Sequence, residues 1–263
     1  LRRAYNEKGW LNESGAKYPV EVAILKDNVL LTIDTSGSGL NRRGYRLAQG
    51  EAPIKETLAA SLIRLANWKG DTPLIDPFCG SGTIAIEACL IAQNIAPGFN
   101  REFVSEQWNI MPANIYDDYR DEADKMADYD KEIEVYASDI DPEMVEIAKR
   151  NAEEVGLSDI IKFSVKDVNT LTIDTEEPVA LIGNPPYGER IGDREEVEEM
   201  YRYIGKLMKQ HPFLSTYILT SNKEFEYLVD RKATKRRKLF NGYIECTYYQ
   251  YWGKKTERKT IEN

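Results

Sequence analysis

The spacing of apolar residues predicts strands and helices that alternate along most of the chain. Short apolar runs predict buried strands, and apolar residues three or four positions apart predict helices. The predicted strands are 73–76, 133–139, 160–165, 179–183 and 213–220, and the predicted helices are 51–68, 83 onward, 142–156 and 194–210. Strands that alternate with helices in this order pair in parallel, so the pattern predicts an α/β fold.

Two of these helices carry a clear apolar stripe. Helix 51–68 has Pro53 in its first turn, where proline is tolerated, and helix 142–156 has an N-cap at Asp141 and a glycine, Gly156, at its end. The two stripes are Ile54, Leu58, Leu62 and Leu65 in the first helix and Val145, Ala148, Ala152 and Val155 in the second. We expect both stripes to pack on the sheet.

Two other segments predict antiparallel hairpins. Residues 18–25 and 29–34 alternate around Lys26-Asp27-Asn28, and residues 236–240 and 243–252 flank Asn241-Gly242, a pair that favours a tight primed turn. Two strands alone are marginally stable, so the first hairpin is expected to finish a small sheet. The second hairpin is expected to finish the parallel sheet.

Two segments do not follow this alternation. Residues 37–46 are basic and rich in glycine, which is typical of a linker, and residues 97–132 are expected to form an inserted loop with an exposed, acidic helix. We assign no chemistry to residues 97–132.

Charge separates the ends of the chain from its centre. The net charge is −9, yet residues 1–70 and 222–263 carry excess lysine and arginine, and the residues between them are strongly acidic. An acidic centre suits a cationic cofactor, and basic flanks suit a polyanion. Lys232 and the run 235–238 fit two interpretations equally, a rim that contacts phosphates and a charged edge strand that resists aggregation.

The residue types exclude several classes of site. Three cysteines, Cys79, Cys89 and Cys246, lack the spacing of metal ligands, and His211 is the single histidine. We therefore expect no metal, no Ser-His triad, and reduced thiols in a cytoplasmic protein. No apolar run approaches membrane-spanning length and no secretory leader is visible, so we expect no membrane association.

The most informative stretch follows the apolar strand 179–183. Asn184, Pro185, Pro186 and Tyr187 must leave the sheet as a stiff corner, because proline cannot donate to the ladder. The carbonyl groups of Asn184 and Pro185 could accept both protons of an exocyclic amine, and the Tyr187 ring could stack on a base. A proline turn with Tyr187 as packing is the alternative, and we favour the functional interpretation.

A glycine loop follows strand 73–76 and indicates a nucleotide site. Gly80 and Gly82 lie between Asp76 at the strand end and the helix from Thr83, as in the first turn of a nucleotide-binding sheet. The loop lacks the third glycine of a dinucleotide site and the lysine of a P-loop. A sulfonium with an amino-acid tail therefore fits better than a pyrophosphate, because Asp76 would attract a positive ligand.

Two more aspartates, Asp139 and Asp167, lie at the ends of predicted strands. The neighbouring Asp141 is expected to cap a helix, which leaves Asp139 free to accept hydrogen bonds from ribose hydroxyls. Asp167, just beyond the next strand, is placed to accept from an adenine amine, although alone it would be an ordinary turn residue.

Three motifs together resemble a known family. Residues 76–83 (DPFCGSGT), 138–142 (SDIDP) and 184–190 (NPPYGER) resemble class I S-adenosylmethionine-dependent methyltransferases that methylate amino groups. The likeness is strongest to THUMP-domain RNA guanine-N2 methyltransferases, because residues 34–37 and 43–46 resemble the junction after that RNA-binding module. It covers roughly residues 18–252.

The resemblance implies a Rossmann-like fold with a mostly parallel seven-stranded sheet, a C-terminal antiparallel hairpin and helices on both faces. It implies that residues 1–46 are the tail of a THUMP-like module with its linker, and that residues 47–263 form the catalytic domain. A complete THUMP module needs more residues than precede Gly44.

The resemblance also implies the residues that bind S-adenosyl-L-methionine and the target. The cofactor residues would be Asp76, Cys79, Gly80, Ser81, Gly82, Thr83, Asp139, Ile140, Asp167, Val168 and Asn184, and the catalytic residues Asn184, Pro185, Pro186 and Tyr187. The predicted reaction is methylation of guanine N2 in RNA, with ribosomal RNA favoured. Transfer RNA guanine, DNA adenine N6, protein glutamine and a non-catalytic RNA-binding assembly factor remain alternatives.

Overall fold

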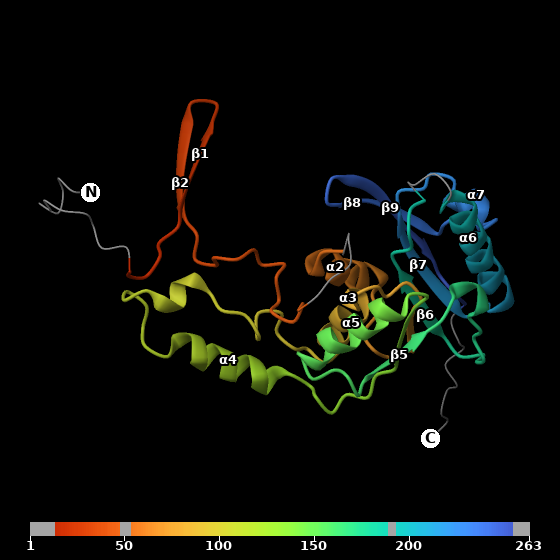
Figure 1. Cartoon of the computed structure of the whole chain (residues 1–263), viewed down its shortest axis with the longest axis horizontal. Helices are drawn as coiled ribbons and strands as arrows, with labels where there is room; N and C mark the ends of the chain where they lie inside the picture. Colours follow the sequence, from red (N-terminus) through yellow and green to blue (C-terminus); the bar gives the residue numbers. More distant parts are fainter. Residues whose placement is uncertain (1–13, 48–53, 189–192, 255–263) are drawn as a thin grey trace, which may run out of the picture.

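The chain folds around a seven-stranded sheet (Figure 1). The computed structural model describes residues 14–47, 54–188 and 193–254. The strands are β3 (Leu74–Asp76), β4 (Val135–Asp139), β5 (Ile161–Val165), β6 (Val179–Gly183), β7 (Leu214–Thr220), β8 (Lys235–Asn241) and β9 (Ile244–Tyr251). Their spatial order is β5-β4-β3-β6-β7-β9-β8, parallel as far as β7, with β9 antiparallel to both of its neighbours. The predicted fold class is confirmed.

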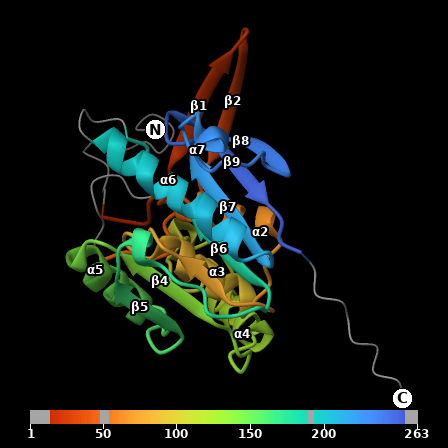
Figure 2. The ribbon, with the colours of Figure 1, turned by 90° about the vertical axis from the view of Figure 1, so that its right-hand side faces the viewer.

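Helices cover both faces of this sheet (Figure 2). Helices α2 (Glu56–Ala66), α3 (Thr83–Ala92) and α5 (Pro142–Glu153) contribute to one apolar core, and α6 (Asp193–Gln210) and α7 (Phe225–Leu228) contribute to the other. Strand β6 is buried along its whole length, with Ile182 in the first core and Leu181 in the second. A continuous apolar run therefore marks a central strand that is covered on both sides.

The first predicted helix is shorter than its apolar pattern suggested. It begins at Glu56, and its buried face consists of Glu56, Ala59, Leu62 and Ile63, whereas Leu58 and Leu65 are only half-buried. Ile54 is buried but precedes the helix. The predicted stripe was therefore rotated, because the buried carboxylate of Glu56 pairs with Arg46 and turns that side of the helix inward. The predicted start with Pro53 lies outside the described residues.

The N-terminal hairpin stands away from the rest of the described chain (Figure 1). β1 (Val20–Leu25) and β2 (Asn28–Ile33) pair as predicted, and the turn residues Lys26 and Asp27 both have positive φ, as a primed turn requires. The two strands form a separate two-stranded sheet within the described residues, so the expected additional strands are not found there. Every residue of both strands is exposed.

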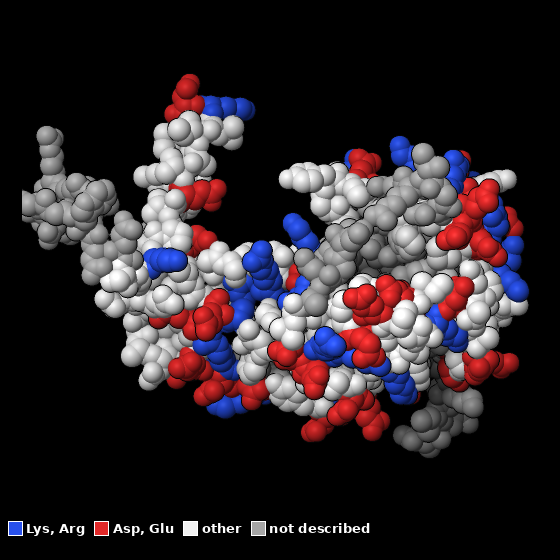
Figure 3. Space-filling view, viewed as in Figure 1, with Lys and Arg blue, Asp and Glu red and all other residues white. Residues whose placement is uncertain are grey.

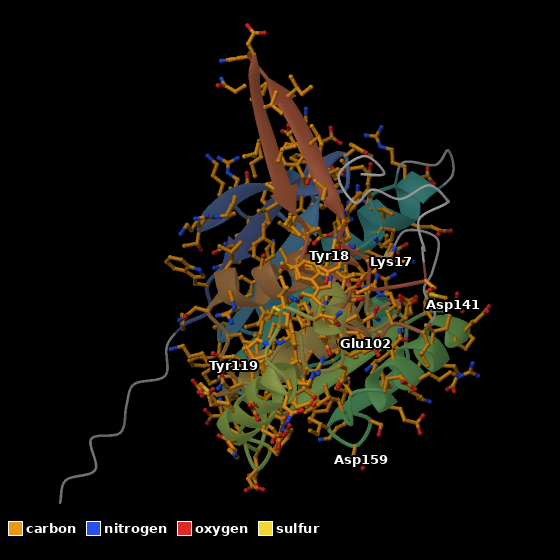
Figure 4. The ribbon with its side chains drawn as sticks, turned by 90° about the vertical axis from the view of Figure 1, so that its left-hand side faces the viewer. Lys17, Tyr18, Glu102, Tyr119, Asp141 and Asp159 are labelled. Carbon is orange, nitrogen blue, oxygen red and sulfur yellow. The ribbon has the colours of Figure 1, made fainter. Side chains whose placement is uncertain are left out.

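Residues 97–132 support the foot of this hairpin. They contain the 3-10 helix η1 (Val104–Gln107) and the exposed helix α4 (Ile115–Met126), and Figure 3 shows acidic and basic side chains interspersed over this part of the molecule. The Trp108 indole donates to the Lys17 carbonyl at 2.7 Å and stacks on Tyr18, which lies at the hairpin foot in Figure 4. The Arg101 guanidinium donates to four backbone carbonyls of residues 36–42. The insertion therefore holds residues 17–18 and residues 36–42, the two segments that flank the hairpin, in place.

Residues 43–46 are packed into the larger body. Tyr45 is buried and donates to Glu87 of α3 at 3.1 Å, and Arg43 lies 3.4 Å from the same carboxylate. Arg46 donates to the hydroxyl of Thr83 at 2.7 Å and to the carbonyl of Ile54 at 2.8 Å. These contacts fix the end of the predicted linker against the start of α3.

The turn of the C-terminal hairpin differs by one residue from the prediction. Asn241 pairs with Ile244, so the two turn residues are Gly242 and Tyr243 rather than Asn241 and Gly242. Gly242 has a φ of 63°, and a glycine with positive φ at the first central position is typical of a type II′ turn. As a result Asn241 is a strand residue with its side chain available for other contacts.

Candidate active site

A cavity of about 1000 Å³ lies at the carboxyl ends of the central strands β3, β4 and β6. Strand order reverses beside β3, and ligands bind at such a switch point in open α/β sheets. Twelve predicted site residues line the cavity: Cys79, Gly80, Ser81, Thr83, Asp139, Ile140, Asp167, Val168, Asn184, Pro185, Pro186 and Tyr187. The structure thus brings together both predicted groups of residues. Asp76 and Gly82 are not among the lining residues.

The two loop glycines have different roles. Gly80 has a φ of 50°, nothing lies within 4 Å of the position of a Cβ, and its N–H donates to Asp139 Oδ2 at 2.9 Å. Gly82 has a φ of 83°, and a Cβ there would lie 3.0 Å from the Cβ of Ala148 on α5. Gly80 therefore keeps the loop open toward the cavity, whereas Gly82 allows the close approach of a helix.

Asp76 is fully buried at the end of β3, behind the glycine loop. Its Oδ1 accepts from the Phe78 N–H at 3.2 Å, and its Oδ2 has no hydrogen-bond partner within the described part of the chain. Burial raises the pKa of Asp76 to about 8, and the nearby Asp139 adds to this increase. A buried carboxylate oxygen with no partner is costly unless it meets a donor or a cation. The ammonium group of an amino-acid ligand is such a cation.

Asp139 and Asp167 are oriented by backbone N–H groups. Asp139 accepts from Gly80 and, at 3.1 Å, from Asp141, whose own side chain caps α5 as predicted. Asp167 accepts from the Asn169 N–H at 2.9 Å and caps the 3-10 helix η2 (Val168–Thr170). These hydrogen bonds hold both carboxylates in place, and each oxygen keeps a lone pair for a ligand.

The Asn184 amide lies at the end of a chain of hydrogen bonds. The Asn241 amide donates to the Tyr187 hydroxyl at 3.2 Å, and that hydroxyl donates to Asn184 Oδ1 at 2.7 Å. Burial, followed by the hydrogen bond with Cys246, raises the pKa of Tyr187, so the hydroxyl keeps its proton and remains a donor. The Tyr187 ring packs against the core as well as lining the cavity.

The proline corner is attached to helix α6. The Tyr201 hydroxyl lies 3.1 Å from the Pro186 carbonyl and 2.9 Å from the hydroxyl of Thr220 at the end of β7. Pro185 is buried and Pro186 is exposed. This attachment makes the corner rigid, which a site that must position a reacting group requires.

The sequence-based reasoning missed about half of the cavity wall. The residues it did not connect with the site are Pro77, Phe78, Ile84, Met144, Lys166, Asn169, Gly188, Glu196, Val197, Glu199, Met200, Asn241 and Ile244. Several are neighbours of predicted residues, and a signal for them was available from adjacency alone. Asn241 ends β8 and Ile244 begins β9, both far away in sequence from the motifs, and only the fold could reveal them.

The residue types in the cavity define what it can bind. Oriented carboxylates suit the hydroxyl and ammonium groups of a cationic nucleoside, and the Asn184 amide oxygen suits an amine donor. No group of three or more metal-ligating side chains occurs within residues 14–47, 54–188 and 193–254. Across the same residues, no helix combines the length and the apolar character that crossing a bilayer demands.

Sequence comparison relates this chain to methyltransferase domains. The profile of the UPF0020 family, described as an RMKL-like methyltransferase domain, matches residues 43–250. YpsC of Bacillus subtilis, provisionally named an RNA methyltransferase, is 54% identical over 97% of this chain and 66% of its own length. The ribosomal RNA large subunit methyltransferase K/L of Shewanella frigidimarina is 38% identical over 89% of this chain and 34% of its own. The chain thus spans less than two thirds of either relative.

Two solved structures are similar over almost the whole chain. SMU.472, provisionally called a methyltransferase and crystallised with SAH, is 41% identical with a TM-score of 0.90, over 97% of this chain and 67% of its own. A Listeria monocytogenes protein, named by prediction an N6-adenine-specific DNA methylase, is 52% identical with a TM-score of 0.89, over 96% of this chain and 65% of its own. Both share the class I methyltransferase fold.

Proposed function

Because the chain belongs to the UPF0020 family of RMKL-like methyltransferase domains, we propose that it transfers a methyl group from S-adenosyl-L-methionine to the N2 amine of a guanine in RNA, with ribosomal RNA as the substrate class. One observation carries this proposal: the Asn184 amide and the carboxylates of Asp139 and Asp167 face one cavity. The chain therefore has an amine acceptor within the same space as the groups that suit a nucleoside cofactor.

The residues around the glycine loop fit S-adenosyl-L-methionine. The unpartnered Oδ2 of Asp76 would pair with the ammonium group, and Asp139 would hold the two ribose hydroxyls. Asp167 and Val168 would lie against the adenine, because they form the wall beyond β5. The relative that was crystallised with SAH supports this choice of cofactor.

The chain itself contributes positioning rather than acid–base catalysis. When bound, the cofactor supplies a methyl group on a cationic sulfur. Asn184 Oδ1 and the Pro185 carbonyl would accept hydrogen bonds from the target amine and direct its lone pair toward the methyl carbon. The methyl group would replace a proton of the amine: the lone pair would form the new N–C bond, the departing sulfide would keep the S–C electrons, and the displaced proton would leave to solvent from the corner formed by Asn184 and Pro185. Fixing both partners in this way can lower the barrier by about 7–11 kcal/mol.

RNA is favoured as the substrate by the names of two relatives. The second candidate is adenine N6 in DNA, which the name of the Listeria structure favours. Both substrates present an exocyclic amine on a planar ring, so the Asn184 corner alone does not distinguish between them.

A methyl-transfer assay separates these candidates. The protein is incubated with methyl-labelled S-adenosyl-L-methionine and, in separate reactions, with unmodified transcripts of large-subunit ribosomal RNA, transfer RNA transcripts and duplex DNA. Mass spectrometry of the digested nucleosides should find label in N2-methylguanosine from ribosomal RNA. Label in N6-methyladenine from DNA, with none in RNA, would contradict the proposal.

We further propose that the β1–β2 hairpin belongs to an N-terminal RNA-binding module of THUMP type. The hairpin exposes eight large apolar side chains on its two strands: Val20, Val22, Ile24, Leu25, Val29, Leu30, Leu31 and Ile33. Contiguous apolar surface of this kind usually packs against another part of a protein. Deuterium exchange would test this, because amides of β1 and β2 should be more protected in a chain that includes such a module.

A further inference from the structure

The turn between β8 and β9 lies at the mouth of the candidate active site. Asn241 and Ile244, the residues on either side of the turn, both line the cavity. The turn itself consists of Gly242 and Tyr243, and Tyr243 is fully exposed. Figures 1 and 2 show this hairpin at the outer edge of the sheet, over α2.

The edge strand β8, which leads to this turn, carries several lysine and arginine side chains. Side chains alternate along a strand, so Lys235, Arg237 and Asn241 share one face of β8. Within the described residues Lys235 and Arg237 make no ion pair, whereas Arg236 and Lys238, on the other face, pair with Glu226 and Glu245. The face that leads to the cavity therefore carries the unpaired cations.

The dimensions of this face suit a nucleic-acid strand. At a rise of about 3.4 Å per residue, Arg237 lies about 14 Å and Lys235 about 20 Å along the strand from Asn241. Two cations at these distances can each contact a phosphate a few nucleotides from a base that has entered the cavity. Charge on an edge strand also discourages aggregation, but that role does not require an exposed tyrosine beside the cavity.

We infer that the β8–β9 hairpin is the docking arm for RNA. Arg237 and Lys235 bind the backbone beside the target nucleotide, and the ring of Tyr243 stacks on the base next to the one that enters the cavity. An exposed aromatic ring at this position suits every base, because all bases have a π-face. This inference rests on the proposed function, since it takes RNA as the substrate and Asn184 as the group that receives the amine.

Matched pairs of variants test the arm. Tyr243→Ala is compared with Tyr227→Ala, which removes another exposed tyrosine, on α7 and away from the cavity. Arg237→Gln is compared with Lys162→Gln, which removes one positive charge from β5, the opposite edge strand. All four side chains are exposed, so thermal unfolding midpoints should match that of the wild type.

The measurements are RNA binding by fluorescence anisotropy, with an unmodified fragment of large-subunit ribosomal RNA as the probe, and the kinetics of methyl transfer. Tyr243→Ala should weaken RNA binding about fivefold or more. Arg237→Gln should reduce the slope of log K against log salt by about 0.7, which corresponds to one phosphate contact on a single strand. Cofactor affinity should not change in any variant, and neither control should affect RNA binding.

The outcomes separate this inference from the proposed function. If the wild type methylates RNA but Tyr243→Ala and Arg237→Gln behave like their controls, the docking arm is wrong and the proposed function stands. If the wild type binds RNA through this hairpin but transfers no methyl group to it, the docking arm stands and the proposed function fails. A wild type that does not bind the RNA probe overturns both.

Discussion

Four side chains at the ends of buried strands form the chemical part of the cavity and its surroundings. Asp76 and Asp139 end predicted strands, and Asp167 and Asn184 follow predicted strands, so local pattern was sufficient to single them out as candidates. What the pattern could not provide was how they differ. Asp76 is fully buried behind the loop, whereas Asn184 receives a hydrogen bond from Tyr187. The burial of Asp76, and the Asn241 amide that bonds to Tyr187, depend on segments remote in sequence, so the local pattern does not report them.

Replacement of Asp76 by asparagine should change how stability depends on pH. The pKa of Asp76 is raised to about 8 in the folded protein, against about 4 in an unfolded chain. The neutral form is therefore favoured by folding, and its contribution is complete below about pH 4 and is lost as the pH rises to about 8. Asparagine does not titrate, so Asp76→Asn should not show this fall in the free energy of unfolding, which in the wild type amounts to at most about 1.4 kcal/mol per pH unit.

Urea unfolding of the cofactor-free protein measures this effect. The stability of Asp76→Asn relative to the wild type should increase between pH 5 and pH 8. The same variant should bind S-adenosyl-L-methionine more weakly in calorimetry, because it lacks a carboxylate for the ammonium group. A stability difference that is equal at both pH values would contradict the account of Asp76.

Tyr187 is expected to act through Asn184. Tyr187→Phe removes the hydroxyl that donates to Asn184 Oδ1, so the amide loses its orientation. A hydrogen bond of about 1 kcal/mol corresponds to a fall of about fivefold in kcat. Cofactor affinity and the KM for RNA should stay near wild type, which steady-state kinetics and calorimetry can measure.

Tyr203→Phe provides the control for this variant. Tyr203 lies on the same helix as Tyr201, and its hydroxyl donates to the Leu171 carbonyl outside the cavity. It should leave kcat unchanged. An equal fall in kcat for both variants would show that the Tyr187 effect reflects general stability instead of orientation of Asn184.

At the scale of elements, strands were predicted more accurately than turns and helix ends. The apolar run of β6 is covered on both faces, so burial and pattern agree there. The C-terminal turn lies one residue later than predicted, because Gly242 and not Asn241 occupies its first central position. Helix α2 buries a different face from the one predicted, because Glu56 is buried beside Arg46. Apolar periodicity does not report such a pairing between segments.

The two loop glycines give a prediction at this scale. Gly82→Ala should destabilise the fold by about 1–3 kcal/mol, because the residue has a positive φ and its Cβ would lie against Ala148 on α5. At Gly80 an added Cβ would have no atom within 4 Å, so Gly80→Ala should lower the free energy of unfolding by about 1–2 kcal/mol through its positive φ alone.

Urea unfolding and cofactor calorimetry distinguish the two glycine variants. Gly82→Ala should lower the free energy of unfolding more than Gly80→Ala does, and Gly80→Ala should weaken cofactor binding more than Gly82→Ala does, since only Gly80 lines the cavity. The reverse ranking would show that the roles assigned to the two glycines are wrong.

At the scale of the whole molecule, the fold places distant segments around one cavity. The sequence predicted the parallel sheet, because each strand and helix has its own periodicity, and its motifs indicated a candidate loop for the cofactor and a candidate corner for the target amine. It could not predict that residues 43–46 brace α3, that residues 97–132 hold the N-terminal hairpin, or that Asn241 reaches Tyr187. Each of these depends on contacts between residues far apart in the chain.

The central claim is that Asn184 receives the target amine in a cavity whose other residues hold the cofactor. Single-turnover methyl transfer by Asn184→Ala, with cofactor affinity measured by calorimetry on the same preparation, tests it most directly. We expect the transfer rate to fall by about 10²–10³-fold, as when one preorganised polar contact is removed from a reacting group, while cofactor affinity stays near wild type. Loss of cofactor binding with little further change in the rate of the bound complex would contradict the claim.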